Sequence, residues 1–279
     1  MKLLRLLAGI PLKLLPFFVW CVYWLSYPFA ARDRRVIQAN ISKVFGLPSH
    51  SEFSRAFVRQ NQKMQALMML ETLRYLFRPD TLVLKGLDEG KEKLRKASQD
   101  SGVVIITAHH GSWELAGHGA ALGFDRDFFV LAKPSKASWL TPILDQIRER
   151  LRMKVLWTDS KSLLRDMMAI AQRKEHLGFV MDQRPLNKQG GHPCVFLGVD
   201  GTQIVSGPVM MAIKKNMPVF SVYMMRVGLG AYQFYCDEVL PPNHGRTDEL
   251  AVAQLMADNM SNMIRRYPEQ WSWSYRRWK

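Results

Sequence analysis

The sequence predicts an α/β fold in which helices flank a mixed, largely parallel sheet and a hydrophobic helix precedes it. Three observations support this prediction. Patterns typical of strands and helices alternate from residue 82 to residue 216, as they do when helices connect parallel strands. Two longer strand patterns then follow each other directly, at 217–227 and 231–240. Residues 14–31 carry no charged side chain and are rich in aromatic residues.

The uncharged stretch Leu14–Ala31 comes first along the chain. At about 1.5 Å per residue, a helix of this length just crosses a hydrocarbon core of about 30 Å. Phe29 stands where a secretory signal needs a small residue before its cleavage site, which argues against a cleaved signal. We therefore expect residues 1–35 to form a membrane anchor helix with a basic flank, and residues 36–279 to form one domain. Whether this helix spans the membrane or dips into one leaflet stays open, and a buried core helix is the alternative to an anchor.

Two helices are expected next, over residues 31–48 and 49–77. In the second, apolar residues recur at three- and four-residue spacing from Phe57 toward Leu73, which is the period of an amphipathic helix. Ser51 precedes this pattern and is the expected N-cap.

The middle of the chain alternates between short apolar runs and amphipathic stretches. The run at 102–108 is almost wholly apolar, as in strands of parallel sheets that are covered on both faces. The expected strands are 82–87, 102–108, 127–133, 154–159 and 176–183, and the expected helices are 88–100, 113–123, 138–152, 161–174 and 207–216. The strands at 217–227 and 231–240 are expected to form an antiparallel edge, and 247–268 a long amphipathic helix.

Charge and cysteine content narrow the class of protein. The 279 residues carry a formal net charge of +15, which favours anionic partners such as an acidic membrane surface, an acidic protein or a phosphorylated substrate. No nucleic-acid recognition motif accompanies this charge, so we expect no nucleic acid. The three cysteines are odd in number and far apart, which argues against a disulfide framework.

The run "TAHHGSWELAG", residues 107–117, follows the buried strand at 102–108 and carries His109, His110 and Glu114. Ligands of open α/β sheets bind beyond the carboxyl ends of the strands. His109 and Asp182 both stand at such ends, which suggests that they share a site.

Three interpretations of this run compete. His110, Glu114 and His118 would share one face of a continuous helix and could bind zinc, but Gly111 and the preceding strand argue against a helix there. In the second interpretation Ser112 caps a helix that begins with Glu114 in its first turn. His109 is then a general base, and Glu114 orients its ring across the corner. The third is a capped helix with two incidental histidines. Spacing alone leaves the second and third open.

Beyond spacing, the run resembles the HX4E signature of the lipid A biosynthesis lauroyl/myristoyl acyltransferases, with His109 and Glu114 at the two named positions. The elements "FVMDQRP", "VFLGVDGTQIVSGPVMMAIKKNMPVF" and "YPEQWSWSYRRWK" follow in the order typical of that family. The resemblance covers nearly the whole chain, and it implies a glycerol-phosphate-acyltransferase-like fold.

The resemblance implies that His109 deprotonates an acceptor hydroxyl, which then attacks an acyl thioester. Glu114 would orient His109, and backbone amides near Gly111 would donate to the oxyanion. Arg148 and Asp182 would bind substrate, with Arg150 a close rival to Arg148. We expect no metal or other cofactor.

The implied partners are acyl carrier protein, or acyl-coenzyme A, as donor and a phosphorylated glycolipid as acceptor. The implied location is the inner membrane with the catalytic domain on the cytoplasmic side. The basic C-terminal tail combines tryptophans with cations, as interfacial anchors do, and a packed C-terminal segment with surface arginines is the alternative. Two alternatives remain: the same chemistry on another glycolipid, an aminolipid or an aryl polyene, and a non-catalytic membrane-associated protein that binds lipid.

Overall fold

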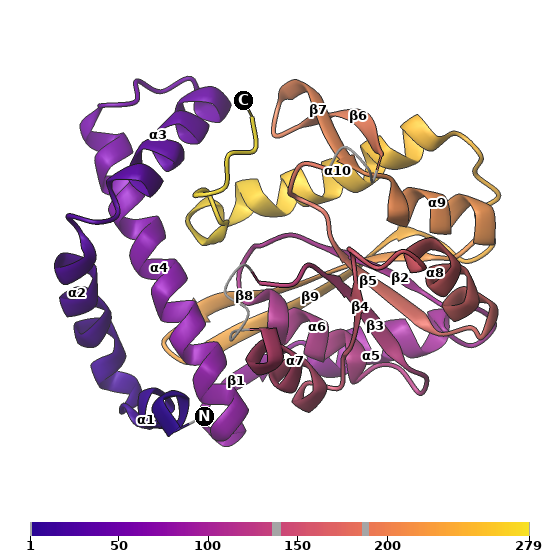
Figure 1. Cartoon of the computed structure of the whole chain (residues 1–279), viewed down its shortest axis with the longest axis horizontal. Coiled ribbons are helices and arrows are strands. Elements are labelled where there is room, and N and C mark those ends of the chain that lie inside the picture. Colours follow the sequence, from indigo (N-terminus) through magenta and orange to yellow (C-terminus); the bar gives the residue numbers. More distant parts are fainter. Residues whose placement is uncertain (1, 136–140, 186–189, 279) are drawn as a thin grey trace.

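A seven-stranded sheet forms the centre of the molecule (Figure 1). The computed structural model describes residues 2–135, 141–185 and 190–278. The strand order is β1-β9-β8-β2-β5-β3-β4. The strands are β1 (Val83–Lys85), β2 (Val104–Thr107), β3 (Phe128–Ala132), β4 (Lys154–Trp157), β5 (His176–Val180), β8 (Val219–Gly228) and β9 (Ala231–Leu240).

All neighbouring strands of this sheet are parallel except β8 and β9, which are antiparallel. The predicted mixed, largely parallel sheet is therefore confirmed. The predicted antiparallel edge is wrong in one respect, because the short strand β1 pairs with β9 in parallel and forms the edge itself. The strand itself was predicted, at 82–87, but its place at the edge beside β9 was not.

Helices cover both faces of the sheet, so the central strand β2 is buried on both sides. Val104 and Ile106 pack into a core shared with α8 (Leu163–Gln172), α9 (Ser206–Lys215) and α10 (Glu249–Arg266). Ile105 points the other way, into a core shared with α5 (Leu87–Ala97) and α6 (Trp113–Ala121), with Ile147 of α7 (Thr141–Arg150) packed against it. This alternation follows from the two-residue period of a strand.

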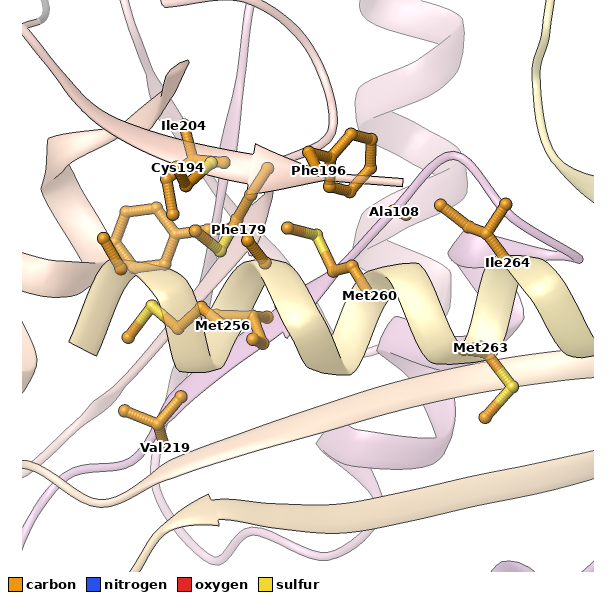
Figure 2. Close-up of a cluster of buried hydrophobic side chains, with 14 of the residues drawn as sticks. Ala108, Phe179, Cys194, Phe196, Ile204, Val219, Met256, Met260, Met263 and Ile264 are labelled. Carbon is orange, nitrogen blue, oxygen red and sulfur yellow. The ribbon is translucent and has the colours of Figure 1, made fainter. Parts of the chain in front are cut away.

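Helix α10 presents the predicted amphipathic face to the first of these cores (Figure 2). Met256, Met260 and Ile264 follow each other at four-residue spacing on the buried side of α10. Phe196 and Ile204 cover the helix from a two-stranded hairpin, β6 (Gly191–Phe196) and β7 (Val199–Val205). The prediction from sequence did not include this hairpin, whose strands alternate buried and exposed residues.

The N-terminal segment forms four helices that stand to one side of the sheet (Figure 1). They are α1 (Lys2–Gly9), α2 (Leu15–Ser26), α3 (Ala31–Phe45) and α4 (Glu52–Phe77). The predicted helices at 31–48 and 49–77 are confirmed, and Ser51 caps α4 by accepting a hydrogen bond from the Ser54 amide at 3.1 Å.

Residues 14–31 do not form the one continuous helix that was predicted, because α2 ends at Ser26 and α3 begins at Ala31; membrane attachment of this segment stays a prediction. Among the described residues, no single helix is both long and apolar enough to span a membrane. One pair of helices reaches that length and composition together, with a 104° bend between its members. The first is Leu12–Ser26, which is α2 with the 3₁₀ turn before it, and the second is Ala31–Phe45, which is α3. The break contains Pro28, which lacks an amide hydrogen and disfavours helical backbone in the residue before it. The first residues of the helix predicted at 138–152 lie outside the described residues.

Candidate active site

The corner between β2 and α6 places His109 at the carboxyl edge of the sheet. Gly111 makes the corner possible, because its φ of +63° is in the left-handed region. A Cβ at this position would also lie 2.4 Å from the carbonyl oxygen of Met224 on β8. Ser112 precedes α6 as predicted but makes no side-chain cap; its hydroxyl instead contacts the hydroxyl of Thr72 on α4 at 2.6 Å.

The register between β2 and β5 brings His109 and Asp182 together. Thr107 pairs with Val180 in the parallel ladder, and each of the two side chains follows two residues later. Nδ1 of His109 lies 2.8 Å from Oδ1 of Asp182, and the amide of His109 donates to Oδ2 at 3.1 Å. Residues 73 positions apart thus form one hydrogen-bonded pair. The two strand ends thus lie together, as predicted, and their role as a functional site stays a prediction.

Glu114 is not the hydrogen-bonding partner of His109, and this corrects the predicted pairing. Its carboxylate instead accepts two hydrogen bonds from Arg148, from Nη2 at 2.9 Å and from Nε at 3.3 Å. Glu114 lies on the first turn of α6, beyond the corner. The ring of His109 lies before the corner and contacts Asp182, which follows β5. Arg150 points elsewhere, with its guanidinium 5.7 Å from the ring centre of Phe77. Of the two rival arginines, the structure therefore brings Arg148 to the corner.

The His109–Asp182 pair is electrostatically favourable in its charged form. Burial alone lowers the pKa of His109, but the charge and hydrogen bond of Asp182 outweigh it, so that this pKa lies above its ordinary value. Burial raises the pKa of Asp182, but the charge and hydrogen bonds of His109 hold it below its usual range. The side chain of His109 keeps 25% of its surface exposed, whereas Asp182 keeps 3%. A substrate can therefore reach the ring, while the carboxylate stays buried.

The C-terminal segment closes the back of the site, which the sequence did not predict. The indole Nε1 of Trp271 donates to Oδ2 of Asp182 at 2.7 Å. The amide of Ser272 donates to the carbonyl of His109 at 2.9 Å, and the amide of Gly111 donates to the carbonyl of Gln270 at 3.1 Å. Trp271 and Trp273 are buried, so the prediction that these tail tryptophans are interfacial anchors is wrong. The only feature of the sequence that pointed to this segment was the tail element "YPEQWSWSYRRWK", which carries both tryptophans.

The backbone amides near Gly111, which were predicted to donate to an oxyanion, already donate to backbone carbonyls. Besides Gly111, the amide of Ser112 donates to the carbonyl of Met224 at 2.9 Å, and the amide of His110 to the carbonyl of Ala108 at 2.7 Å. These backbone groups hold the corner together. A positive charge still acts at the corner, because the guanidinium of Arg148, although paired with Glu114, lowers the pKa of His109.

The zinc interpretation finds no matching geometry. His110 precedes α6, and its Nε2 lies 2.8 Å from the carbonyl of Tyr267. His118 bonds to the carbonyl of Leu151 and the hydroxyl of Tyr75 instead. No group of three or more His, Cys, Asp or Glu side chains among the described residues is arranged to hold a metal ion.

Comparison with known proteins now identifies the family. The model of the bacterial lipid A biosynthesis acyltransferases matches residues 1–279. The chain belongs to this family. It is 26% identical over 259 residues to the lipid A biosynthesis palmitoleoyltransferase of Escherichia coli (strain K12), a match that covers 91% of this chain and 81% of that protein. A lipid A biosynthesis acyltransferase of Shigella flexneri matches with the same identity and the same coverage.

The protein is therefore an acyltransferase, and its corner has the parts that acyl transfer to a hydroxyl needs. A histidine with one ring nitrogen fixed by a carboxylate leaves its other nitrogen to take a proton. Among the described residues, Nε2 of His109 has no hydrogen-bond partner, and it is not one of the buried unsatisfied atoms. An arginine beside it can hold an anionic oxygen. In this acyltransferase the four predicted site residues thus gather at one corner as two pairs, His109 with Asp182 and Arg148 with Glu114.

Proposed function

We propose that this acyltransferase transfers a fatty acyl chain from an acyl thioester to a hydroxyl of a lipid A precursor, with His109 as general base. The observation that carries the proposal is the buried hydrogen bond between Nδ1 of His109 and Asp182, which leaves Nε2 open at the carboxyl edge of the sheet. The matched relatives are named for lipid A biosynthesis, which supports the acceptor class.

The proposed reaction has two proton transfers. Nε2 takes the proton of the acceptor hydroxyl while the oxygen attacks the thioester carbonyl, and Asp182 stabilises the imidazolium that forms. The tetrahedral intermediate collapses, the carbon–sulfur bond breaks, and the sulfur leaves with the proton that His109 returns. The products are the acyl ester and the free thiol.

Arg148 and Glu114 act together in this proposal. The Arg148 guanidinium lies close enough to His109 for its charge to lower the pKa of that ring. Such a cation stabilises a negatively charged oxygen, either on the tetrahedral intermediate or on an acceptor phosphate. Glu114 fixes the guanidinium through two hydrogen bonds, so its role is to orient Arg148 rather than His109.

The donor and the location follow from charge and exposed surface. A net charge of +15 suits an acidic acyl carrier protein and an anionic leaflet. Phe17, Leu25 and Phe29 expose 67%, 77% and 89% of their surface, on or next to the short helix α2. We infer that α2 lies in the plane of the inner membrane surface on its cytoplasmic side, with this apolar face among the lipids.

Mass spectrometry of lipid A tests the proposal. Lipid A from cells that lack the gene should miss the mass of one acyl chain. Wild type and His50→Ala, which changes an exposed histidine away from the corner, should restore this mass, whereas His109→Ala should not. Loss of a general base costs roughly a hundred- to ten-thousandfold in rate.

An unchanged lipid A profile in cells without redundant enzymes would contradict the proposed acceptor. The same comparison on total lipid extracts would then reveal an acylated glycolipid, aminolipid or aryl polyene. A non-catalytic lipid-binding protein would give neither change, and it would keep its ligand affinity after substitution of His109.

A further inference from the structure

The carboxylate of Asp182 is held by Trp271 as well as by His109. Oδ1 faces Nδ1 of His109 at 2.8 Å. Oδ2 accepts from the His109 amide at 3.1 Å and from Nε1 of Trp271 at 2.7 Å. The Trp271 contact is the shortest of the three, and both of its residues are buried.

A carboxylate with one oxygen anchored keeps the other oxygen in a fixed direction. A partial rotation about the Cβ–Cγ bond of Asp182 would turn both carboxylate oxygens out of line with their donors. The His109 amide restrains this rotation at only one point, and its bond is long. The indole adds a rigid donor, because its ring is buried and packs edge-on against Phe196 at a centroid distance of 6.0 Å.

The segment that carries Trp271 is itself fixed from the other side. Asn61 of α4 donates to the carbonyls of Glu269 and Trp271, at 2.9 and 2.7 Å. Gln65 of α4 donates to the carbonyl of Gln270 at 2.7 Å. Helix α4 thus holds the segment in place, and the amide of Ser272 holds it to the carbonyl of His109.

We propose that Trp271 is a positioning residue for the acyl transfer, because its indole N–H fixes the Asp182 carboxylate that orients His109. The inference rests on the proposed role of His109 as general base. Trp271 itself touches no reacting atom. Its effect passes through Asp182 to the ring and keeps the proton on Nδ1 and the lone pair on Nε2.

Trp271→Phe tests this role, and Trp273→Phe is the matched control. Both substitutions remove one indole N–H from a buried ring of the same segment, but Nε1 of Trp273 donates to the carbonyl of Pro268 at 2.7 Å instead. The measurements are kcat and KM for acyl transfer, and ¹⁵N NMR of histidine-labelled protein to report the tautomer of His109. We expect Trp271→Phe to lower kcat about ten- to a hundredfold with little change in KM, since misalignment of a reacting group has a cost of this size.

In the NMR experiment, wild type and Trp273→Phe should show His109 protonated at Nδ1, and Trp271→Phe should show the second tautomer. Equal losses in the two variants, or an unchanged tautomer in Trp271→Phe, would overturn the positioning role. If Trp271→Phe does not fold, benzothienylalanine at position 271 replaces only the N–H with sulfur and must give the same result. A wild type without acyl transfer whose tautomer still depends on Trp271 would contradict the proposed function and leave the positioning role standing.

Discussion

At the residue scale, Asp182 sets both the orientation and the basicity of His109. In the proposed mechanism the general base acts as the neutral imidazole, so the rate should fall as the pH drops through the His109 pKa, which Asp182 raises despite the opposing effect of burial. Asp182→Asn removes that charge and leaves the effect of burial. We expect the acidic limb of the pH profile of kcat/KM to move to lower pH. We also expect the plateau to fall by roughly two to four orders of magnitude. An acidic limb that stays in place would show that another group titrates.

Arg148 and Arg150 give a second comparison at this scale, because both lie on the last turn of α7 and only Arg148 reaches the corner. We expect Arg148→Ala to lower kcat/KM about a hundredfold, as loss of one oxyanion donor does. Arg148→Lys should recover little of it, since a single ammonium nitrogen cannot repeat the planar pair of donors, Nε and Nη2, that binds Glu114. Arg150→Ala should remain near wild type in a steady-state assay. Equal losses would contradict the assignment of Arg148 to the site.

The sequence could locate the site residues but could not pair them. His109 and Asp182 were predictable as strand-end residues, because a parallel sheet brings such ends to one edge. Their register was not predictable, and it decides that Asp182 rather than Glu114 contacts the ring. Trp271 was beyond reach, since its bond to Asp182 spans 89 positions and depends on how the last segment packs.

At the element scale, the β2–α6 corner depends on close contact with β8 as well as on backbone conformation. Gly111 and Gly201 have nearly the same φ, +63° and +66°, but a Cβ at Gly201 would meet nothing within 4 Å. We expect Gly201→Ala to lower the free energy of unfolding by about 1–2 kcal/mol, which is the cost of left-handed backbone. Gly111→Ala should cost about 1–3 kcal/mol more, because its Cβ would strike the Met224 carbonyl.

Denaturant unfolding of the two variants measures this difference. Equal losses of stability would mean that β8 can move away from the corner without cost. A fall in activity beyond the unfolded fraction is expected only for Gly111→Ala, because the strain lies two residues from His109.

Two elements were predicted wrongly or missed, because the local sequence pattern did not reveal how the chain bends or packs there. The apolar stretch at 14–31 continues through Pro28 without a polar interruption, so hydropathy alone hides the bend between α2 and α3. The hairpin β6–β7 exposes one face and packs the other on α10, and Gly198 and Gly201 interrupt its pattern with left-handed backbone. The long strands and helices of the sheet were predictable, because their periodicity extends over more residues.

At the scale of the whole molecule, the N-terminal helices connect the exposed apolar face with the site. Helix α2 packs against α4 through Val19 and Leu70. On its other side, α4 holds the C-terminal segment through Asn61 and Gln65, and that segment contacts both His109 and Asp182. Helix α4 and the C-terminal segment thus lie side by side next to the sheet (Figure 1). A lipid acceptor taken from the membrane would meet this side of the molecule.

This arrangement predicts that vesicle binding depends on the apolar face of α2 and not on exposed apolar residues elsewhere. The double variant Leu25→Glu with Phe29→Glu removes two of the most exposed apolar side chains and adds two negative charges. Its affinity for phosphatidylglycerol vesicles in a sedimentation assay should fall at least about tenfold, since burial of one such side chain is worth roughly 1.5–3 kcal/mol. Leu164→Glu is the control, because Leu164 is 56% exposed on α8. Wild-type binding by the double variant would place the membrane contact elsewhere. If the variant keeps its activity on acceptor dispersed in detergent, α2 supplies membrane attachment and leaves the chemistry to the corner.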